Sequence, residues 1–279
     1  MKLHVIDTGF FKLDGGAMFG VVPKSIWQKT NPADAGNLCT WAMRSLLIED
    51  GNQLILIDNG IGDKQDDKFF SHYQPHGDAT LQKSLNKLGY DMADVTDVIL
   101  SHLHFDHCGG AIVREDESLV PTFKNATYWS NQKHWQWATE PNAREKAAFL
   151  KENILPIQQS GQLKFVEDGS TAVNSNIMLK TVSGHTESMF IPHIKAGDKT
   201  LIYCADLFPS MAHIPLPYVM AYDTRPLLTL NEKKELLDYA AANNCYLFFE
   251  HDKSIECCSL QSTERGVRSN ETFKLSDLF

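Results

Sequence analysis

A chain of 279 residues with 43% hydrophobic residues can bury a substantial core, which excludes a disordered or fibrous protein. Its formal net charge of −9, without a dense Lys/Arg cluster, disfavours nucleic acid as a partner. The first ten residues, MKLHVIDTGF, lack the pattern of a secretory signal peptide. Because no apolar run reaches about eighteen residues either, we expect a cytoplasmic protein that does not bind membranes.

In the first half of the chain, strand-like patterns dominate. Alternating or short apolar runs predict strands over residues 2–9, 41–49, 53–58 and 95–100. Apolar residues at helical spacing predict a helix over 80–88, which Gly89 ends. The glycine-rich, apolar segment 15–23 is predicted to be a first hairpin, with a flexible lip over the site as the alternative.

The second half begins with a predicted strand over 126–130, followed by helices over 131–139 and 143–155. Further strands are predicted over residues 163–166, 177–182, 188–195 and 200–205. A final helix over 231–243 leads into an apolar strand over 246–249. Strands therefore dominate around the polar clusters described next.

Strands accompanied by helices in both halves predict an α/β (α+β) fold, an αββα sandwich in which two mixed sheets pack together and helices cover the outer faces. Because neither a linker nor an internal repeat is visible, a single domain is expected over residues 1–279. The six scattered cysteines are predicted to be reduced, buried thiols instead of a disulfide framework.

The densest chemical signal is the segment SHLHFDHCGG, residues 101–110, directly after a predicted strand. In an extended segment, His102 and His104 point to the same side and can bind one ion together. Asp106 and His107 lie beyond the following turn and can reach a second ion. This cluster predicts a metal centre.

Three further ligand candidates, His185, Asp206 and His251, each follow a predicted strand. Strand ends present side chains at the rim of a sandwich, where an open metal site must lie. Imidazoles and carboxylates suit borderline divalent cations, so two divalent metal ions are expected, Zn²⁺ first, with Mn²⁺, Fe²⁺ or Co²⁺ as alternatives. Two ions can activate a bridging hydroxide, so no side-chain nucleophile is required.

The motif HxHxDH, followed by a histidine after glycine, an aspartate and a last histidine, resembles the ordered motif set of the metallo-β-lactamase superfamily over residues 1–255. The resemblance implies a metallo-β-lactamase-type fold. It implies that the first metal is held by His102, His104 and His185 and the second by Asp106, His107 and His251, with Asp206 bridging both. It also implies that Asp58 orients a ligating histidine and that Asp106 takes part in proton transfer.

Within the superfamily, the chain resembles the branch of N-acyl homoserine lactonases and methyl-parathion-hydrolase-like enzymes. His104 differs from the carboxylate of the flavodiiron branch, and the 28 residues after His251 are too few for the helical domain of glyoxalase II. Lactonases close to this pattern carry a tyrosine three residues after the bridging aspartate, where this chain has Pro209. Aromatic residues that could line an apolar pocket are Phe208, Tyr218, Tyr222, Trp135 and Trp137.

The resemblance thus implies a dinuclear hydrolase that uses a metal-bridging hydroxide to cleave a small lactone or ester, either lactonase-like or like the organophosphate and aryl ester hydrolases. A small-molecule substrate is expected, and a homodimer is what the resemblance implies. The alternative hypothesis is a metal-binding redox or biosynthetic accessory protein on the same fold. A non-catalytic binding module is disfavoured because none of the ligand positions is missing.

Overall fold

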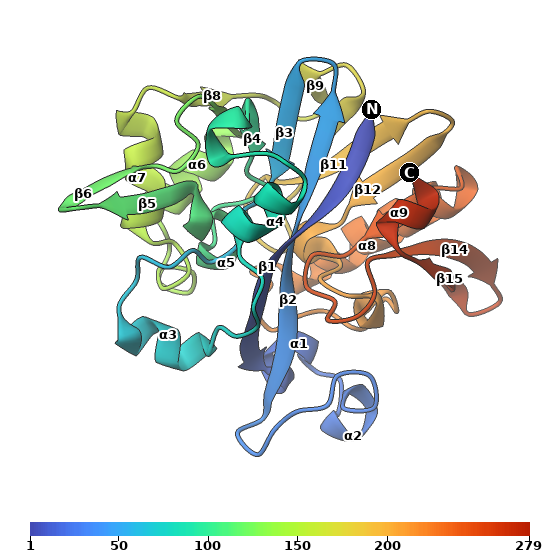
Figure 1. Ribbon diagram of the computed structural model, residues 1–279. Helices are drawn as coiled ribbons and strands as arrows, with labels where there is room; N and C mark the ends of the chain where they lie inside the picture. Colours follow the sequence, from blue (N-terminus) through green and yellow to red (C-terminus); the bar gives the residue numbers. More distant parts are fainter.

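The computed structural model describes residues 1–279 and contains two large sheets that lie face to face (Figure 1). The six-stranded sheet has the spatial order β1 (Lys2–Asp14), β2 (Leu38–Asp50), β3 (Gln53–Ile57), β4 (Asp97–Ile99), β7 (Thr127–Ser130) and β8 (Leu163–Phe165). The seven-stranded sheet has the order β15 (Gly266–Phe273), β14 (Cys257–Thr263), β13 (Tyr246–Phe248), β12 (Lys199–Tyr203), β11 (Met189–Ala196), β10 (Ile177–Val182) and β9 (Ser170–Asn174). Both sheets mix parallel and antiparallel pairs.

Helices and a small hairpin surround the sheets. The helices are α1 (Gly15–Phe19), α2 (Lys24–Trp27), α3 (Asp67–Tyr73), α4 (Leu81–Lys87), α5 (Phe105–Cys108), α6 (Gln132–Thr139), α7 (Lys151–Gln159), α8 (Pro226–Ala242) and α9 (Leu275–Leu278). The hairpin pairs β5 (Ile112–Glu115) with β6 (Ser118–Pro121). None of the helices is long and apolar enough to cross a membrane.

The side-chain alternation of β2 explains the layered arrangement. Leu46 and Ile48 belong to the large core between the two sheets, together with Ile202 of β12. Leu47, pointing to the opposite face, packs in a second core with Leu85 of α4. Because one strand contributes to both cores, the first sheet is apolar on both faces, with the second sheet on one side and helices on the other. This confirms the predicted α/β fold with two mixed sheets.

The prediction of a hairpin over 15–23 is wrong, because the segment forms the short helix α1 and a turn that leads into α2; both helices protrude at the lower end of Figure 1. The Asp14 side chain caps α1 by accepting a hydrogen bond from the Ala17 amide at 2.8 Å. Phe19 stacks on Trp27 with ring centroids 5.4 Å apart, so apolar packing holds the two helices together.

The helix predicted over 143–155 begins later, at Lys151. Asn142 accepts hydrogen bonds through Oδ1 from the amides of Arg144 and Glu145, at 2.9 and 3.1 Å, which forms a local turn instead of a helix. The Ala148 carbonyl accepts from the amide of Phe105 at 3.0 Å, so this segment is also tied to α5. The resulting loop between α6 and α7, residues 140–150, borders the site described below.

Candidate metal centre

Five strands end at one edge of the sandwich and carry the polar residues there. β3 runs parallel to β4, and β12 runs parallel to β13, while β10 points the same way as β12 because both are antiparallel to β11. Their carboxyl ends are followed by Asp58, His102, His185, Asp206 and His251, respectively for β3, β4, β10, β12 and β13. The topology therefore brings residues from distant parts of the chain to one rim.

The backbone after His107 must pass very close to the loop that follows β3. A Cβ atom on Gly109 would lie 2.0 Å from the Ile61 carbonyl oxygen, and one on Gly110 would lie 2.2 Å from that of Asn59. Only glycine allows the two backbone segments to approach so closely. This approach fixes the position of the short helix α5, whose Asp106 and His107 face the rim. The two glycines that end the cluster thus have a steric cause.

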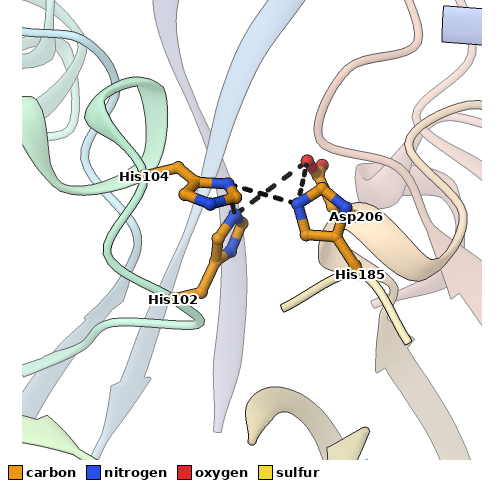
Figure 2. A group of neighbouring side chains, drawn as sticks. All are labelled: His102, His104, His185 and Asp206. Carbon is orange, nitrogen blue, oxygen red and sulfur yellow. Dashed lines mark hydrogen bonds and ion pairs between the residues drawn. The ribbon is translucent and has the colours of Figure 1, made fainter. Parts of the chain in front are cut away.

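His102, His104 and His185 form a first histidine group (Figure 2). His104 Nδ1 lies 3.0 Å from His102 Nε2 and 3.2 Å from His185 Nε2. Two ligand nitrogens on one tetrahedral zinc ion are ~3.3 Å apart when each bond is about 2.0–2.1 Å. Burial lowers the pKa of His102 well below its ordinary value, whereas at His185 the carboxylates of Asp206 and Asp223 outweigh burial and raise the pKa. Metal binding to this group would therefore release a proton from His185.

Asp106, His107 and His251 form a second group beside the first. His251 Nε2 lies 3.1 Å from His107 Nε2, and both nitrogens face Asp106 Oδ2, at 3.7 and 3.8 Å. All three side chains are buried, although Asp106 also reaches the cavity wall. The second group has the donor types of a second divalent cation site.

Asp206 lies between the two groups and turns a different carboxylate oxygen to each. Its Oδ2 lies 3.2 Å from His185 Nε2, and its Oδ1 lies 3.1 Å from His251 Nε2. Oδ1 is buried and makes no hydrogen bond with the protein. Burial alone would raise the pKa of Asp206, but the surrounding imidazoles, His107 first, lower it well below its usual range. A charged, buried carboxylate between two nitrogen clusters fits a pair of cations.

The second ring nitrogen of each histidine faces an oxygen atom outside the two groups. The pairs are His102 with Ser101 Oγ (3.1 Å), His104 with Glu145 Oε1 (3.6 Å), His107 with Asp58 Oδ2 (3.2 Å), His185 with Asp223 Oδ1 (2.9 Å) and His251 with the Ala42 carbonyl (2.8 Å). Such outer partners set the tautomer and orientation of a metal-binding imidazole. The ring nitrogens that remain all point toward Asp206 or its neighbours, so the residues present fit two metal ions.

Two residues near the rim adopt left-handed backbone conformations. Asp58 has φ 56° and Ala205, directly before Asp206, has φ 41°. These conformations are unfavourable for residues with a Cβ atom and are typical of sites where the fold holds a side chain in place. Asp58 accepts hydrogen bonds from the Ser101 amide and hydroxyl, at 2.7 and 2.5 Å, which holds the start of the cluster loop.

A cavity of about 290 Å³ opens beside the two groups. Its floor is formed by His104, Asp106, His185, Asp206 and His251, and its walls by apolar side chains with Tyr73, Tyr222, Arg144 and Glu145. This volume lies at the lower end of the range of small-molecule sites, about 300–1,000 Å³. The cavity therefore suits a small substrate that reaches the metal groups.

The structure brings together all seven residues proposed as ligands, and it places Asp58 against His107 as expected. Of the five aromatic residues expected at the pocket, only Tyr222 lines the cavity. Phe208 and Trp135 belong instead to the two cores, because strand and helix packing buries their rings. All six cysteines are free and buried, which agrees with the prediction of an apolar role.

Sequence reasoning missed the outer partners Glu145 and Asp223. Glu145 lay inside a predicted helix, and no spacing rule connects Asp223 to a histidine 38 residues earlier. His134 is buried and accepts a hydrogen bond from the Leu103 amide at 2.8 Å. Burial lowers the pKa of His134 to about 3, so its neutral ring supports the backbone between His102 and His104.

Comparison with known proteins agrees with this arrangement. The sequence profile of the metallo-beta-lactamase superfamily matches residues 44–251, most of the chain. An N-acyl homoserine lactonase of Bacillus thuringiensis is 25% identical over 264 residues, covering 90% of this chain and 93% of the relative.

Solved structures show the same fold. A probable metal-dependent hydrolase from Staphylococcus aureus has a TM-score of 0.89 at 26% identity, covering 98% of this chain and 96% of the other. A dizinc quorum-quenching lactonase has a TM-score of 0.80 at 22% identity, covering 98% and 95%. At these identities, the arrangement of the fold is better preserved than the sequence.

Proposed function

Because the chain belongs to the metallo-beta-lactamase superfamily, we propose that it is a dinuclear metal-dependent hydrolase that cleaves a small lactone or ester. The observation that carries this proposal is the position of Asp206, whose two oxygens face different histidine groups at 3.2 and 3.1 Å on the floor of the cavity. The lactonases among the relatives support the lactone or ester as substrate class.

The first ion would be held by His102, His104 and His185, the second by Asp106, His107 and His251, and Asp206 would contribute to both. When bound, such ions lower the pKa of a water molecule toward neutrality and polarise the electrophilic oxygen of the substrate. Zn²⁺ is the leading candidate for the donor set, and the dizinc lactonase supports it.

Asp106 is placed to handle the proton of the reaction. Its carboxylate lines the cavity, and one of its oxygens faces His107 and His251 while it accepts no hydrogen bond from the protein. A carboxylate with free lone pairs at the cavity wall can accept a proton and pass it to the leaving group. We therefore assign the proton transfer to Asp106.

Tyr222 takes the place of the missing lactonase tyrosine in this proposal. Pro209 offers only its carbonyl, which accepts from the His251 amide at 3.0 Å. Tyr222 and Tyr73 line the cavity, and neither hydroxyl makes a hydrogen bond with the protein. Burial raises the pKa of Tyr73 to about 12 and also raises that of Tyr222, so both phenols keep their proton at neutral pH and can donate to a substrate oxygen.

The test combines metal analysis with a substrate panel. Purified protein is freed of metal, loaded with two equivalents of Zn²⁺, and assayed with lactones, aryl esters, thioesters and phosphotriesters. We expect turnover of a lactone or ester that chelation abolishes and Zn²⁺ restores, and that His251→Ala removes. Loaded protein that hydrolyses none of these substrates, or that carries redox-active iron without hydrolysis, would overturn the proposal in favour of an accessory role.

A further inference from the structure

The loop between α6 and α7 contacts the first histidine group through Glu145. This carboxylate is buried, and its Oε1 lies 3.6 Å from His104 Nε2; neither atom has a hydrogen-bond partner in the protein. Oε2 accepts hydrogen bonds from Trp137 Nε1 at 2.7 Å and Asn142 Nδ2 at 2.6 Å. A carboxylate held by two donors therefore faces the outer nitrogen of His104.

The preceding residue, Arg144, reaches a second loop from the same turn. Its guanidinium donates hydrogen bonds to the carbonyl oxygens of Ala221 and Asp223, the latter at 3.1 Å. The Asp223 carboxylate in turn lies 2.9 Å from His185 Nδ1. Two neighbouring residues thus support the outer nitrogens of two histidines, His104 directly and His185 through Asp223.

The side-chain hydrogen bonds of this loop do not reach the histidines of the second group, although its Ala148 carbonyl accepts a hydrogen bond from the Phe105 amide of α5 at 3.0 Å. The outer nitrogen of His107 faces Asp58 and Glu250, at 3.2 and 3.0 Å, and that of His251 faces the Ala42 carbonyl at 2.8 Å. These partners come from β2 and from the residues that follow β3 and β13. The two groups therefore have separate outer supports, although Asp206 joins them at the centre.

From this separation we infer that Arg144 and Glu145 are positioning residues that set the metal affinity of the first histidine group and leave that of the second group unchanged. The inference rests on the two-ion site of the proposed function. An oriented imidazole with a fixed tautomer binds a metal more tightly, and loss of an outer partner lowers the affinity by about 10–100-fold. Arg144 also lines the cavity, so the same loop shapes the wall that meets the substrate.

The variants Arg144→Ala and Glu145→Gln test the inference by different routes. Arg144 is exposed, so its truncation releases the loop at Asp223 without opening the core. A glutamine in place of Glu145 has only one side-chain oxygen. If that oxygen faces His104, the amide N–H groups face the donors of Trp137 and Asn142; if it accepts from those donors, the N–H groups face His104. Lys146→Ala, an exposed neighbour in the same loop, is the matched control.

The experiment titrates metal-free protein with Zn²⁺ against a chelator of known affinity. We expect wild type and Lys146→Ala to bind two ions alike, whereas each test variant binds one ion as wild type does and the other about 10–100-fold more weakly. In the one-ion state, histidine-ring ¹⁵N shifts are expected to show metal at His107 and His251 and none at His104 and His185. Circular dichroism and the thermal midpoint of each metal-free variant establish that it is folded.

Equal weakening of both sites, or two ions bound with wild-type affinity in both variants, would overturn the inference. A wild-type chain that binds fewer than two ions would overturn both this inference and the proposed function. A wild-type chain that binds two ions and hydrolyses nothing in the panel overturns only the function, because the titration measures metal affinity without any substrate.

Discussion

The carboxylate of Asp223 lies 2.9 Å from Nδ1 of His185, while Nε2 of the same ring faces Asp206 at 3.2 Å. This contact assigns the proton of His185 to Nδ1 and leaves Nε2 free as a ligand. Asp223 belongs to a loop 38 residues further along the chain, so its role depends on the position of that loop.

Asp223→Ala is expected to weaken the first metal site by about 10–100-fold, because His185 loses the acceptor that orients it. Chelator competition measures the affinity, with the exposed Asp198→Ala as control. Since Arg144 acts through the same loop, the double variant Arg144→Ala/Asp223→Ala should lose less than the product of the single effects. Fully multiplicative losses would show that Arg144 and Asp223 act independently.

Asp106→Asn is expected to lower kcat by about 100-fold or more, because the amide can neither accept the proton nor balance the charge of the second metal. Metal content must be measured beside the rate, since Asp106 is also a proposed ligand. A variant that retains both ions and full turnover would remove the proton-transfer role of Asp106 and leave only a structural one.

Tyr222→Phe is expected to reduce kcat by about 10–100-fold. This reduction is smaller than that expected when a fully buried hydrogen-bond donor is removed, because Tyr222 is 39% exposed. Metal content and KM should change little, since the ring remains in the cavity wall. Tyr239→Phe, on α8 and outside the cavity, is the control. If kcat is unchanged in Tyr222→Phe, the donor to the substrate oxygen is either Tyr73 or no phenol. The variant Tyr73→Phe distinguishes these two cases.

Lys233→Met is expected to lower the free energy of unfolding by about 2–4 kcal/mol. The buried ammonium donates hydrogen bonds to the carbonyl oxygens of His213, Pro215, Leu216 and Tyr218, at 2.7, 3.1, 3.4 and 2.8 Å. Without it, the loop between Asp206 and Tyr222 loses its anchor. Urea unfolding gives the value, and the exposed neighbour Lys234→Met should change it by no more than about 0.5 kcal/mol.

His213 should make the stability of the metal-free protein depend on pH. Burial, with a smaller effect of Lys233, lowers the pKa of His213 to about 3, against about 6.5 in the unfolded chain. The unfolded state therefore binds more protons between pH 3 and 6.5, and stability falls as pH drops below 6.5, by up to about 1.4 kcal/mol per pH unit. His213→Gln should reduce this slope in chelator-treated protein, whereas the exposed His72→Gln should retain it.

The fold class and the candidate ligands could be predicted from the sequence because their signals are local. Short apolar strands followed by histidine or aspartate show both where a sheet ends and which donors stand at its edge. The errors occurred where side chains override local pattern. Asp14 caps a helix in the segment predicted as a hairpin, and Asn142 turns the chain where helical spacing predicted α7 to begin.

What the sequence determined by itself is the set of seven candidate donors, four in the segment 102–107 and three after later strands, since residue type and order along the chain suffice to identify them. Only the tertiary structure decided which oxygen of Asp206 faces which group, that Glu145 and Asp223 border the site, and that Tyr222 alone of the five expected aromatic residues lines the cavity. These residues meet the histidines through loops whose paths follow from packing and side-chain hydrogen bonds. The periodicity of a sequence indicates on which face of a helix or strand a residue lies. It does not indicate which distant loop will contact that residue.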